Sequence, residues 1–202
     1  MILYDFVFHP TYFPTIYQYA KMLQSRKVVF EVEDNYQKQT YRNRCFIYGA
    51  NGKQLLNVPV TKVSGKQKTK DILINYSANW QKEHVKSLIS AYKSSPFFEF
   101  YIDELMPVFM EQKKYLLDLN IFIFSKLNEA LQIDIPFKMT ADYGKEIDND
   151  FRYLVNAKKE ISLNLPKYTQ VFQKKHGFIP NLSILDLLFN EGPNAEMYLL
   201  NL

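Results

Sequence analysis

"ILYDFVFHPTYFPTIYQYAKMLQSRKVVFEVE", residues 2–33, carries the pattern that decides the fold. Residues 2–8 are apolar on both faces, as in a strand buried in the middle of a sheet. Residues 15–24 place apolar side chains at helical spacing directly after Pro14, and residues 27–33 form a second apolar strand. A strand, a short helix and a strand of this total length match a βαβ unit, whose crossover makes the two strands parallel.

The next segments predict a hairpin and further strands. Residues 44–60 contain two apolar runs separated by Asn51-Gly52. This dipeptide is typical of a type I′ hairpin turn, because both central residues of that turn need a positive φ. Residues 70–75 predict another short strand, and residues 135–140 predict a strand within an otherwise irregular region.

The second half of the chain is predicted to be mainly helical. Trp80 opens a helix with a stripe of side chains at steps of four, and Pro96 lies in the first turn of the next helix. Residues 112–132 form a third helix with leucines on one side. In "LSILDLLF" we expect Ser183 as the N-cap and Asp186 as the acidic member of a capping box.

Composition and pattern together predict one folded domain over residues 1–202. A chain of 202 residues can bury a full core, and its 47% hydrophobic content excludes disorder as the default state. No repeat and no long Gly/Ser linker divides it. We expect an α/β fold: a small mixed sheet with a βαβ start and a β-hairpin, packed against a helical C-terminal half. An α+β arrangement is the alternative.

The sequence predicts a cytoplasmic protein without a membrane span. No apolar run approaches the ~18–20 residues that a membrane helix needs. The N-terminus has neither the basic region nor the small-residue cleavage site of a signal peptide. Cys45, the single cysteine, cannot form an internal disulfide, which fits a reducing compartment.

Several classes of site are excluded by the absence of their motifs. The three histidines are far apart and no HExxH or CxxC spacing occurs, so no metal site is predicted. No Gly-rich phosphate loop and no GxSxG elbow is present, and no cofactor is identified. Basic residues interleaved with tyrosines are a feature of single-strand nucleic-acid binders. However, the tyrosines are spread over the whole chain and no recognition signature appears, so we predict no nucleic-acid partner.

The positive charge is concentrated in one part of the chain. The net charge is +4, yet residues 36–70 contain eight basic residues and no acidic one. These residues are Lys38, Arg42, Arg44, Lys53, Lys62, Lys66, Lys68 and Lys70. Such segregation indicates an anionic small-molecule partner. For the lysines of residues 62–70, a solvated loop is the alternative.

Three segments supply the candidate site. His9 and Tyr12 follow the first strand, where open α/β sheets bind ligands, although "HPTYFP" is alternatively a turn that packs aromatic rings. "YQKQTYRNRC" follows the second strand and belongs to the same edge of the sheet if the βαβ prediction holds. His84, on the helix that begins at Trp80, is either a third site residue or a satisfied core histidine.

The arginines of "YQKQTYRNRC" have two interpretations. A guanidinium group is suited to bidentate recognition of carboxylate or phosphate, which makes Arg42 and Arg44, with Lys38, candidate ligand-binding residues. The alternative is that these arginines form salt bridges with the acidic residues just before them, which are Glu31, Glu33 and Asp34.

Five segments, taken in order, resemble the WbqC-like protein family. They read "HPTYFPTIYQYAKM", "YQKQTYRNRC", "ANGKQLLNVPV", "NWQKEHVKSLISAYKSSPFFEFY" and "HGFIPNLSILDLLFNEGP". The resemblance runs from Pro10 to Pro193, and the second and last segments are similar to those of Bacteroidetes-type members. The family's recurring polar positions match Pro10, Tyr12, Pro14, Gln37, Lys38, Asn43, Arg44, Trp80, His84, Asp186, Asn190 and Gly192. His9 departs from the glutamine of many members.

The resemblance implies a role in bacterial surface-polysaccharide (O-antigen) synthesis, as an acyl or aminoacyl transferase, with glycine as one candidate for the transferred group. Such an enzyme would act on an amino-sugar nucleotide, whose diphosphate suits Arg42 and Arg44. It would also need a base with a pKa near neutral, for which His84 or His9 is the candidate, with Tyr12 positioning the acceptor. Gln37 and Asn43 join the ligand-binding set through the resemblance. The acyl donor is not identified. A non-catalytic binding or scaffold protein for an anionic metabolite is the second hypothesis.

Overall fold

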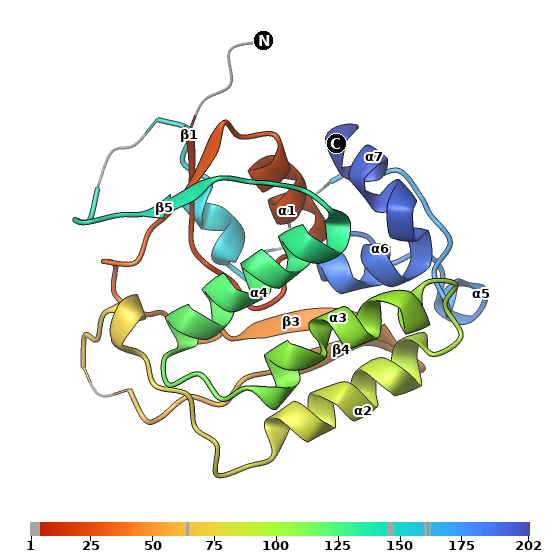
Figure 1. Cartoon of the computed structure of the whole chain (residues 1–202), viewed down its shortest axis with the longest axis horizontal. Coiled ribbons are helices and arrows are strands. Elements are labelled where there is room, and N and C mark those ends of the chain that lie inside the picture. The colour runs from red at the N-terminus through yellow and green to blue at the C-terminus, as the bar shows by residue number, and fades with distance from the viewer. Residues whose placement is uncertain (1–4, 64, 145–147, 160, 162) are drawn as a thin grey trace.

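A computed structural model gives the fold and describes residues 5–63, 65–144, 148–159, 161 and 163–202. The predicted βαβ unit is confirmed (Figure 1). Its elements are β1 (Asp5–Phe8), α1 (Ile16–Leu23) and β2 (Lys27–Phe30). Strands β1 and β2 pair in parallel, from Asp5 opposite Lys27 to Phe8 opposite Phe30. Residues 2–4 of the predicted strand lie outside the described residues.

A third parallel strand completes this sheet. The predicted strand at residues 135–140 is confirmed as β5 (Phe137–Met139), and it pairs with β2 to give the order β1-β2-β5. On the other side of β1, Val7 pairs with Asp150 in an isolated parallel bridge. The carboxyl ends of three parallel strands therefore lie at one edge, and the chain near Asp150 runs beside them.

The hairpin is confirmed, but its turn is not of the predicted type. Strands β3 (Arg44–Gly49) and β4 (Gly52–Asn57) are antiparallel, with Gly49 opposite Gly52. Among the turn residues only Gly52 has a positive φ, of 97°, and Asn51 does not. A type I′ turn needs two left-handed residues, so the prediction that Asn51 and Gly52 supply both was wrong.

The helical half is also confirmed, with changes at its edges. Residues 112–115 precede the third helix instead of belonging to it. The predicted strand at residues 70–75 was wrong: a 3₁₀ turn, η1, is followed by isolated bridges of Leu73 and Ile74. The remaining elements are η1 (Thr69–Asp71), α2 (Trp80–Tyr92), α3 (Phe98–Met110), α4 (Leu116–Leu131), η2 (Arg152–Val155), α5 (Gln173–His176), α6 (Ile184–Glu191), η3 (Gly192–Asn194) and α7 (Ala195–Leu200).

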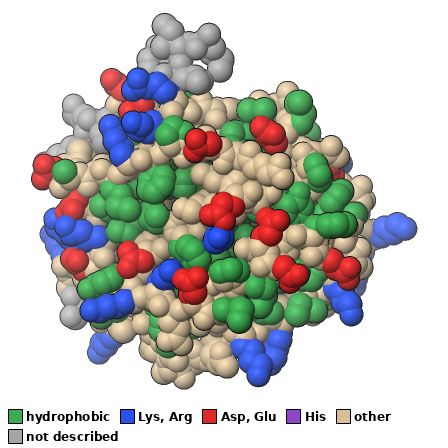
Figure 2. Space-filling view, in the orientation of Figure 1, with side chains coloured by type: hydrophobic (Ala, Val, Ile, Leu, Met, Phe, Trp, Pro, Cys, Tyr) green, Lys and Arg blue, Asp and Glu red, His purple; other side chains and the backbone are tan. Residues whose placement is uncertain are grey.

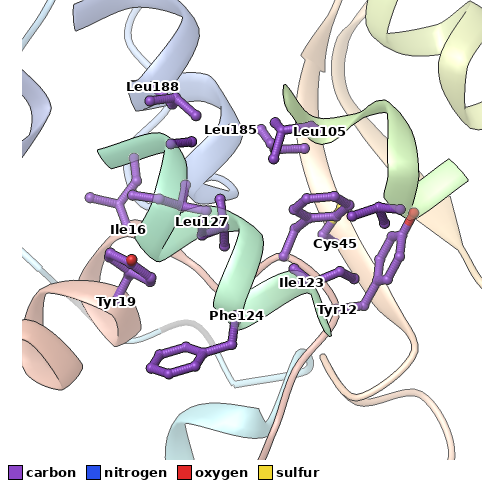
Figure 3. Close-up of a cluster of buried hydrophobic side chains, with 14 of the residues drawn as sticks. Tyr12, Ile16, Tyr19, Cys45, Leu105, Ile123, Phe124, Leu127, Leu185 and Leu188 are labelled. Carbon is purple, nitrogen blue, oxygen red and sulfur yellow. The ribbon is translucent and has the colours of Figure 1, made fainter. Parts of the chain in front are cut away.

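The core lies where α1, α4 and α6 meet, and the predicted α/β class is confirmed. Figure 3 shows Ile16 of α1 beside Leu127 of α4, with Leu185 and Leu188 of α6 close by. The start of α1 is also bound to the C-terminal segment through the backbone. The Ile16 amide donates to the Leu182 carbonyl at 3.0 Å, and the Ile184 amide donates to the Pro14 carbonyl at 2.8 Å.

Helix α6 begins as predicted, but its acidic residue has another role. Ser183 is the N-cap and accepts a hydrogen bond from the Leu185 amide. Asp186 does not complete a capping box, because its buried carboxylate accepts hydrogen bonds from three remote side chains. These are Tyr92 at 2.8 Å, Tyr168 at 2.5 Å and Gln170 at 2.8 Å. Burial raises the pKa of Asp186, and the three donors oppose that rise.

The surface in Figure 2 carries acidic and basic side chains interspersed with apolar ones. Among the helices that the structure describes, none combines the length and the apolarity that crossing a bilayer requires.

Candidate functional site

A cleft of about 420 Å³ opens at the carboxyl edge of the parallel sheet. His9 follows β1 directly, Glu31 follows β2 and Thr140 follows β5. Backbone hydrogen bonds continue the sheet past these ends, since the Glu31 amide donates to Phe8 and the Thr140 amide donates to Phe30. The polar residues that line the cleft include His9, Asp34, Gln37, Arg42, Asp150, Arg152 and Lys159. The structure thus brings His9, Gln37 and Arg42 together at this edge, where open α/β sheets bind ligands.

His9 is held in the cleft wall by two oxygen atoms. Its Nδ1 lies 3.4 Å from the Glu31 carbonyl oxygen, and its Nε2 lies 3.6 Å from Oδ2 of Asp34. Only 7% of the residue is exposed. Burial lowers the pKa of His9 well below its ordinary value, and the charge of Arg42 lowers this pKa further. The imidazole is therefore neutral at pH 7 and has a nitrogen able to accept a proton.

Arg42 is fully buried and forms an ion pair with Asp34. Its Nη2 donates to Oδ2 of Asp34 at 2.6 Å, and its Nη1 donates to the Thr40 hydroxyl at 3.3 Å. The other Asp34 oxygen accepts a hydrogen bond from the Thr69 hydroxyl at 2.6 Å. Burial lowers the pKa of Arg42, and Asp34 opposes this shift. For Arg42, the salt-bridge alternative of the sequence analysis is confirmed.

Two further charged residues of the cleft were missed by sequence reasoning. Arg152 forms a bidentate pair with Asp150, with Nε–Oδ1 at 2.9 Å and Nη2–Oδ2 at 2.7 Å. This pairing lowers the pKa of Asp150 and raises that of Arg152. Nη1 of Arg152 also lies 3.5 Å from the buried Glu31 carboxylate. Both residues come from a region predicted as irregular, and no local pattern marks them.

The other predicted ligand-binding residues lie on the opposite side of the same loop. Lys38, Asn43 and Arg44 line a second hollow of about 370 Å³, together with Lys62. Gln37 and Arg42 line the first cleft. The loop between β2 and β3 is thus a wall between two hollows, and the structure divides the predicted binding set between them.

Tyr12 and His84 form a buried pair. The Tyr12 hydroxyl donates to Nδ1 of His84 at 2.7 Å, and the Trp80 ring centroid lies 5.2 Å from that of His84. Figure 3 shows the Tyr12 ring beside core side chains such as Ile123. Burial lowers the pKa of His84 to about 4, and a backbone hydrogen bond to Asn57 opposes that shift. Neither residue lines the two hollows described above.

The pKa of His84 predicts a loss of stability in acid. An unfolded histidine takes up a proton near pH 6.5, whereas folded His84 resists it until about pH 4. The stabilisation is therefore complete above pH 6.5 and disappears as the pH falls to about 4, by about 3 kcal/mol in all. Urea unfolding at several pH values should show this slope, and His84→Asn should reduce it to the part that the lowered pKa of His9 contributes. Equal slopes for both proteins would contradict the assignment.

Neither the cysteine nor a cluster of metal-binding side chains supplies a further reactive group among the described residues. Cys45 is buried, and burial raises the pKa of its thiol far above its ordinary value, so this thiol is a poor nucleophile. No group of three or more histidine, cysteine or acidic side chains with the spacing of a metal site occurs among the described residues.

Comparisons with known proteins identify relatives. The WbqC-like protein family matches the chain over residues 9–162 and 156–198. A protein of Mycobacterium tuberculosis named "Uncharacterized protein Rv1507c" is 29% identical over 195 residues, which cover 81% of this chain and 83% of that protein. No solved structure gives a significant match.

Proposed function

This chain belongs to the WbqC-like protein family, and from that premise we propose that it is an acyl or aminoacyl transferase. Its acceptor is an amino sugar carried by a nucleotide, its product belongs to bacterial surface-polysaccharide (O-antigen) synthesis, and glycine is one candidate for the transferred group. The reaction takes place in the cytoplasm, and residues 1–202 act as a single WbqC-like domain.

The observation that supports this proposal is a neutral histidine in a cleft at the carboxyl edge of a parallel sheet. Acyl transfer to an amine forms a C–N bond, breaks the bond between the acyl carbon and its leaving group, and releases a proton from the amine. His9 lines the cleft and its lowered pKa keeps it unprotonated at pH 7, so it can take up that proton. Asp34, 3.6 Å from Nε2, then stabilises the imidazolium.

Of the two histidines predicted as the base, we assign the role to His9. His84 is bonded to Tyr12 inside the core and lines neither hollow, whereas His9 lines the cleft where a substrate can reach it. The Tyr12–His84 pair helps to fix the position of His9, because Tyr12 belongs to the same turn as His9. The Tyr12 amide also donates to the Tyr41 carbonyl at 2.9 Å, which ties this turn to the loop after β2. The residues proposed to bind the anionic substrate divide between the two hollows: Gln37 and Arg42 line the cleft, and Lys38, Asn43 and Arg44 line the second hollow.

A second candidate function is non-catalytic binding of an anionic metabolite. It is favoured by the pairing of the cleft's charges: Arg42 binds Asp34 and Arg152 binds Asp150. A site whose charges are already satisfied can recognise a ligand without performing chemistry on it.

Turnover separates the two candidates. Purified protein is incubated with UDP- and dTDP-linked amino sugars, with coenzyme A thioesters or with amino acids and ATP as donors. The mass of the sugar nucleotide is then followed. We expect a mass gain that His9→Asn lowers about 10²–10⁴-fold in kcat, the usual contribution of a general base. His84→Asn is the matched control and should act through stability, leaving kcat of the folded protein within a few fold.

Two results would contradict this proposal. A mass gain that persists at full rate in His9→Asn would remove His9 as the base. Binding of these sugar nucleotides without any mass gain, across all donors, would favour the non-catalytic candidate.

A further inference from the structure

The second hollow has a wholly different charge balance from the cleft. It is formed by the loop after β2, the start of β3 and the segment after β4. Three cations, Lys38, Arg44 and Lys62, line it, and none of its described lining residues is acidic. The cleft, by contrast, contains Asp34 and Asp150 beside its arginines. The hollow is therefore a concentration of positive charge with space for a ligand.

These three cations have no hydrogen-bonding side-chain partners among the described residues. No ion pair or side-chain hydrogen bond of the described part of the chain includes Lys38, Arg44 or Lys62. Other basic groups of the same region differ, because Lys68 and Lys70 both bind Glu33. The salt-bridge alternative therefore fails for Arg44, although it holds for Arg42.

Buried polar atoms at the hollow also lack partners. Nε of Arg44 and Oδ1 of Asn43 are both buried and make no hydrogen bond with any described residue. A buried polar atom without a partner is costly, and a charged donor is the costliest kind. The Asn43 backbone and amide nitrogen, meanwhile, are bonded to Val58, which fixes the position of the side chain. The hollow is thus held in shape while its polar groups stay available.

An aromatic ring and two valines, Tyr36, Val60 and Val63, also line the hollow. Tyr36 is half-buried, and its amide donates to the Gln67 carbonyl at 2.8 Å. Burial raises the pKa of Tyr36, while Arg42 and Arg44 oppose the rise, so its phenol lies in the field of both guanidinium groups. Val60 and Val63 are partly buried against the core. Aromatic rings of this kind stack on nucleobases.

We infer that this hollow binds a nucleoside diphosphate, with the phosphates on Lys38, Arg44 and Lys62 and the base against Tyr36. Its volume of about 370 Å³ lies in the range of small-molecule sites. The inference that the bound nucleotide is part of the transferase substrate rests on the proposed function. The inference that the hollow binds a nucleotide does not depend on that function. Lys62 and Tyr36 are new site residues, and Arg42, which is paired with Asp34, is not among the phosphate ligands.

Isothermal titration with UDP and with inorganic pyrophosphate tests the inference. Arg44→Met should weaken binding of both probes at least tenfold, and Lys62→Met about three- to tenfold. Lys66→Met is the matched control: it removes the same charge from the same loop outside the hollow, and should change Kd less than twofold. Tyr36→Leu should weaken UDP binding while leaving pyrophosphate binding nearly unchanged. Because Arg44 and Lys62 have no side-chain partner among the described residues, their variants should melt close to the wild-type temperature.

Several outcomes would overturn the inference. The first is that the folded protein binds neither UDP nor pyrophosphate. The second is that Lys62→Met and Lys66→Met change Kd equally. The third is that Asp34→Asn abolishes binding while Arg44→Met does not. Failure of the proposed function looks different: UDP binding would depend on Arg44 and Lys62 while no sugar gains mass with any donor. Transfer that ignores both residues would instead reject this site and keep the function.

Discussion

Replacing Arg42 by methionine should lower the free energy of unfolding by about 3–5 kcal/mol, the usual cost of removing one partner of a buried ion pair. The side chain is fully buried, and its Nη2 lies 2.6 Å from Oδ2 of Asp34. Without the guanidinium, the Asp34 carboxylate would keep only the Thr69 hydroxyl and the neutral His9 beside it. Urea unfolding monitored by circular dichroism measures the loss.

The double variant Arg42→Met/Asp34→Asn separates the pair from the packing of the arginine stem. It removes both charges, so its loss of stability should be smaller than that of Arg42→Met alone. Arg44→Met, two residues away, is the control and should cost less than about 1 kcal/mol, as for a charged side chain without a specific partner. If Arg42→Met also lowers the free energy of unfolding by less than about 1 kcal/mol, the buried Asp34 carboxylate does not depend on Arg42 for its stabilisation.

Replacing Asp186 by alanine should lower the free energy of unfolding by a similar amount, about 3–5 kcal/mol, because it leaves three buried donors without their acceptor. These donors come from Tyr92, Tyr168 and Gln170. The effect extends to the hairpin, since the oxygen of Tyr92 also accepts a hydrogen bond from the Tyr48 amide at 2.9 Å. Thermal and urea unfolding of the variant give the size of the loss.

Asp186→Asn is the informative control. Asparagine keeps the volume and one acceptor oxygen, and it is uncharged, which is the form that burial favours by raising the pKa of Asp186. Its loss should therefore be clearly smaller than that of Asp186→Ala. If the two variants lose the same amount, the hydrogen bonds of the acid are not what stabilises this part of the core.

The elements with a strong local pattern could be predicted from the sequence. The apolar runs around Pro14 predict the βαβ unit because strand and helix periodicities are both local properties. A helix that connects two neighbouring strands makes those strands parallel. Parallel pairing, in turn, places His9 at the edge of the sheet where the cleft opens. Asn51-Gly52 correctly predicted a hairpin but not its turn, since several turn types use a left-handed glycine.

The charged part of the site could not be predicted in the same way. Asp150 and Arg152 reach the cleft only because their segment pairs with Val7 of β1, a contact that no local pattern indicates. Arg42 and Arg44 look equivalent in sequence, yet Asp34 is in reach of the first alone. Asp186 has the spacing of a capping box, but distant tyrosines offer its carboxylate stronger partners than the helix N-terminus does.

The attachment of α1 to the chain's far end bears on the order of events during synthesis. Strand β2 pairs with β5 and Ile16 bonds to Leu182, so the βαβ unit depends on segments that are translated much later than the unit itself. Contacts of such long range require large loops to close, which slows folding. Strand β2 therefore lacks β5 until residues 137–139 have been translated, and Ile16 of α1 lacks its acceptor until Leu182 has been translated. The cleft around His9 likewise needs Asp150 and Arg152, which line it, so a chain that stalls before residue 150 lacks this cleft.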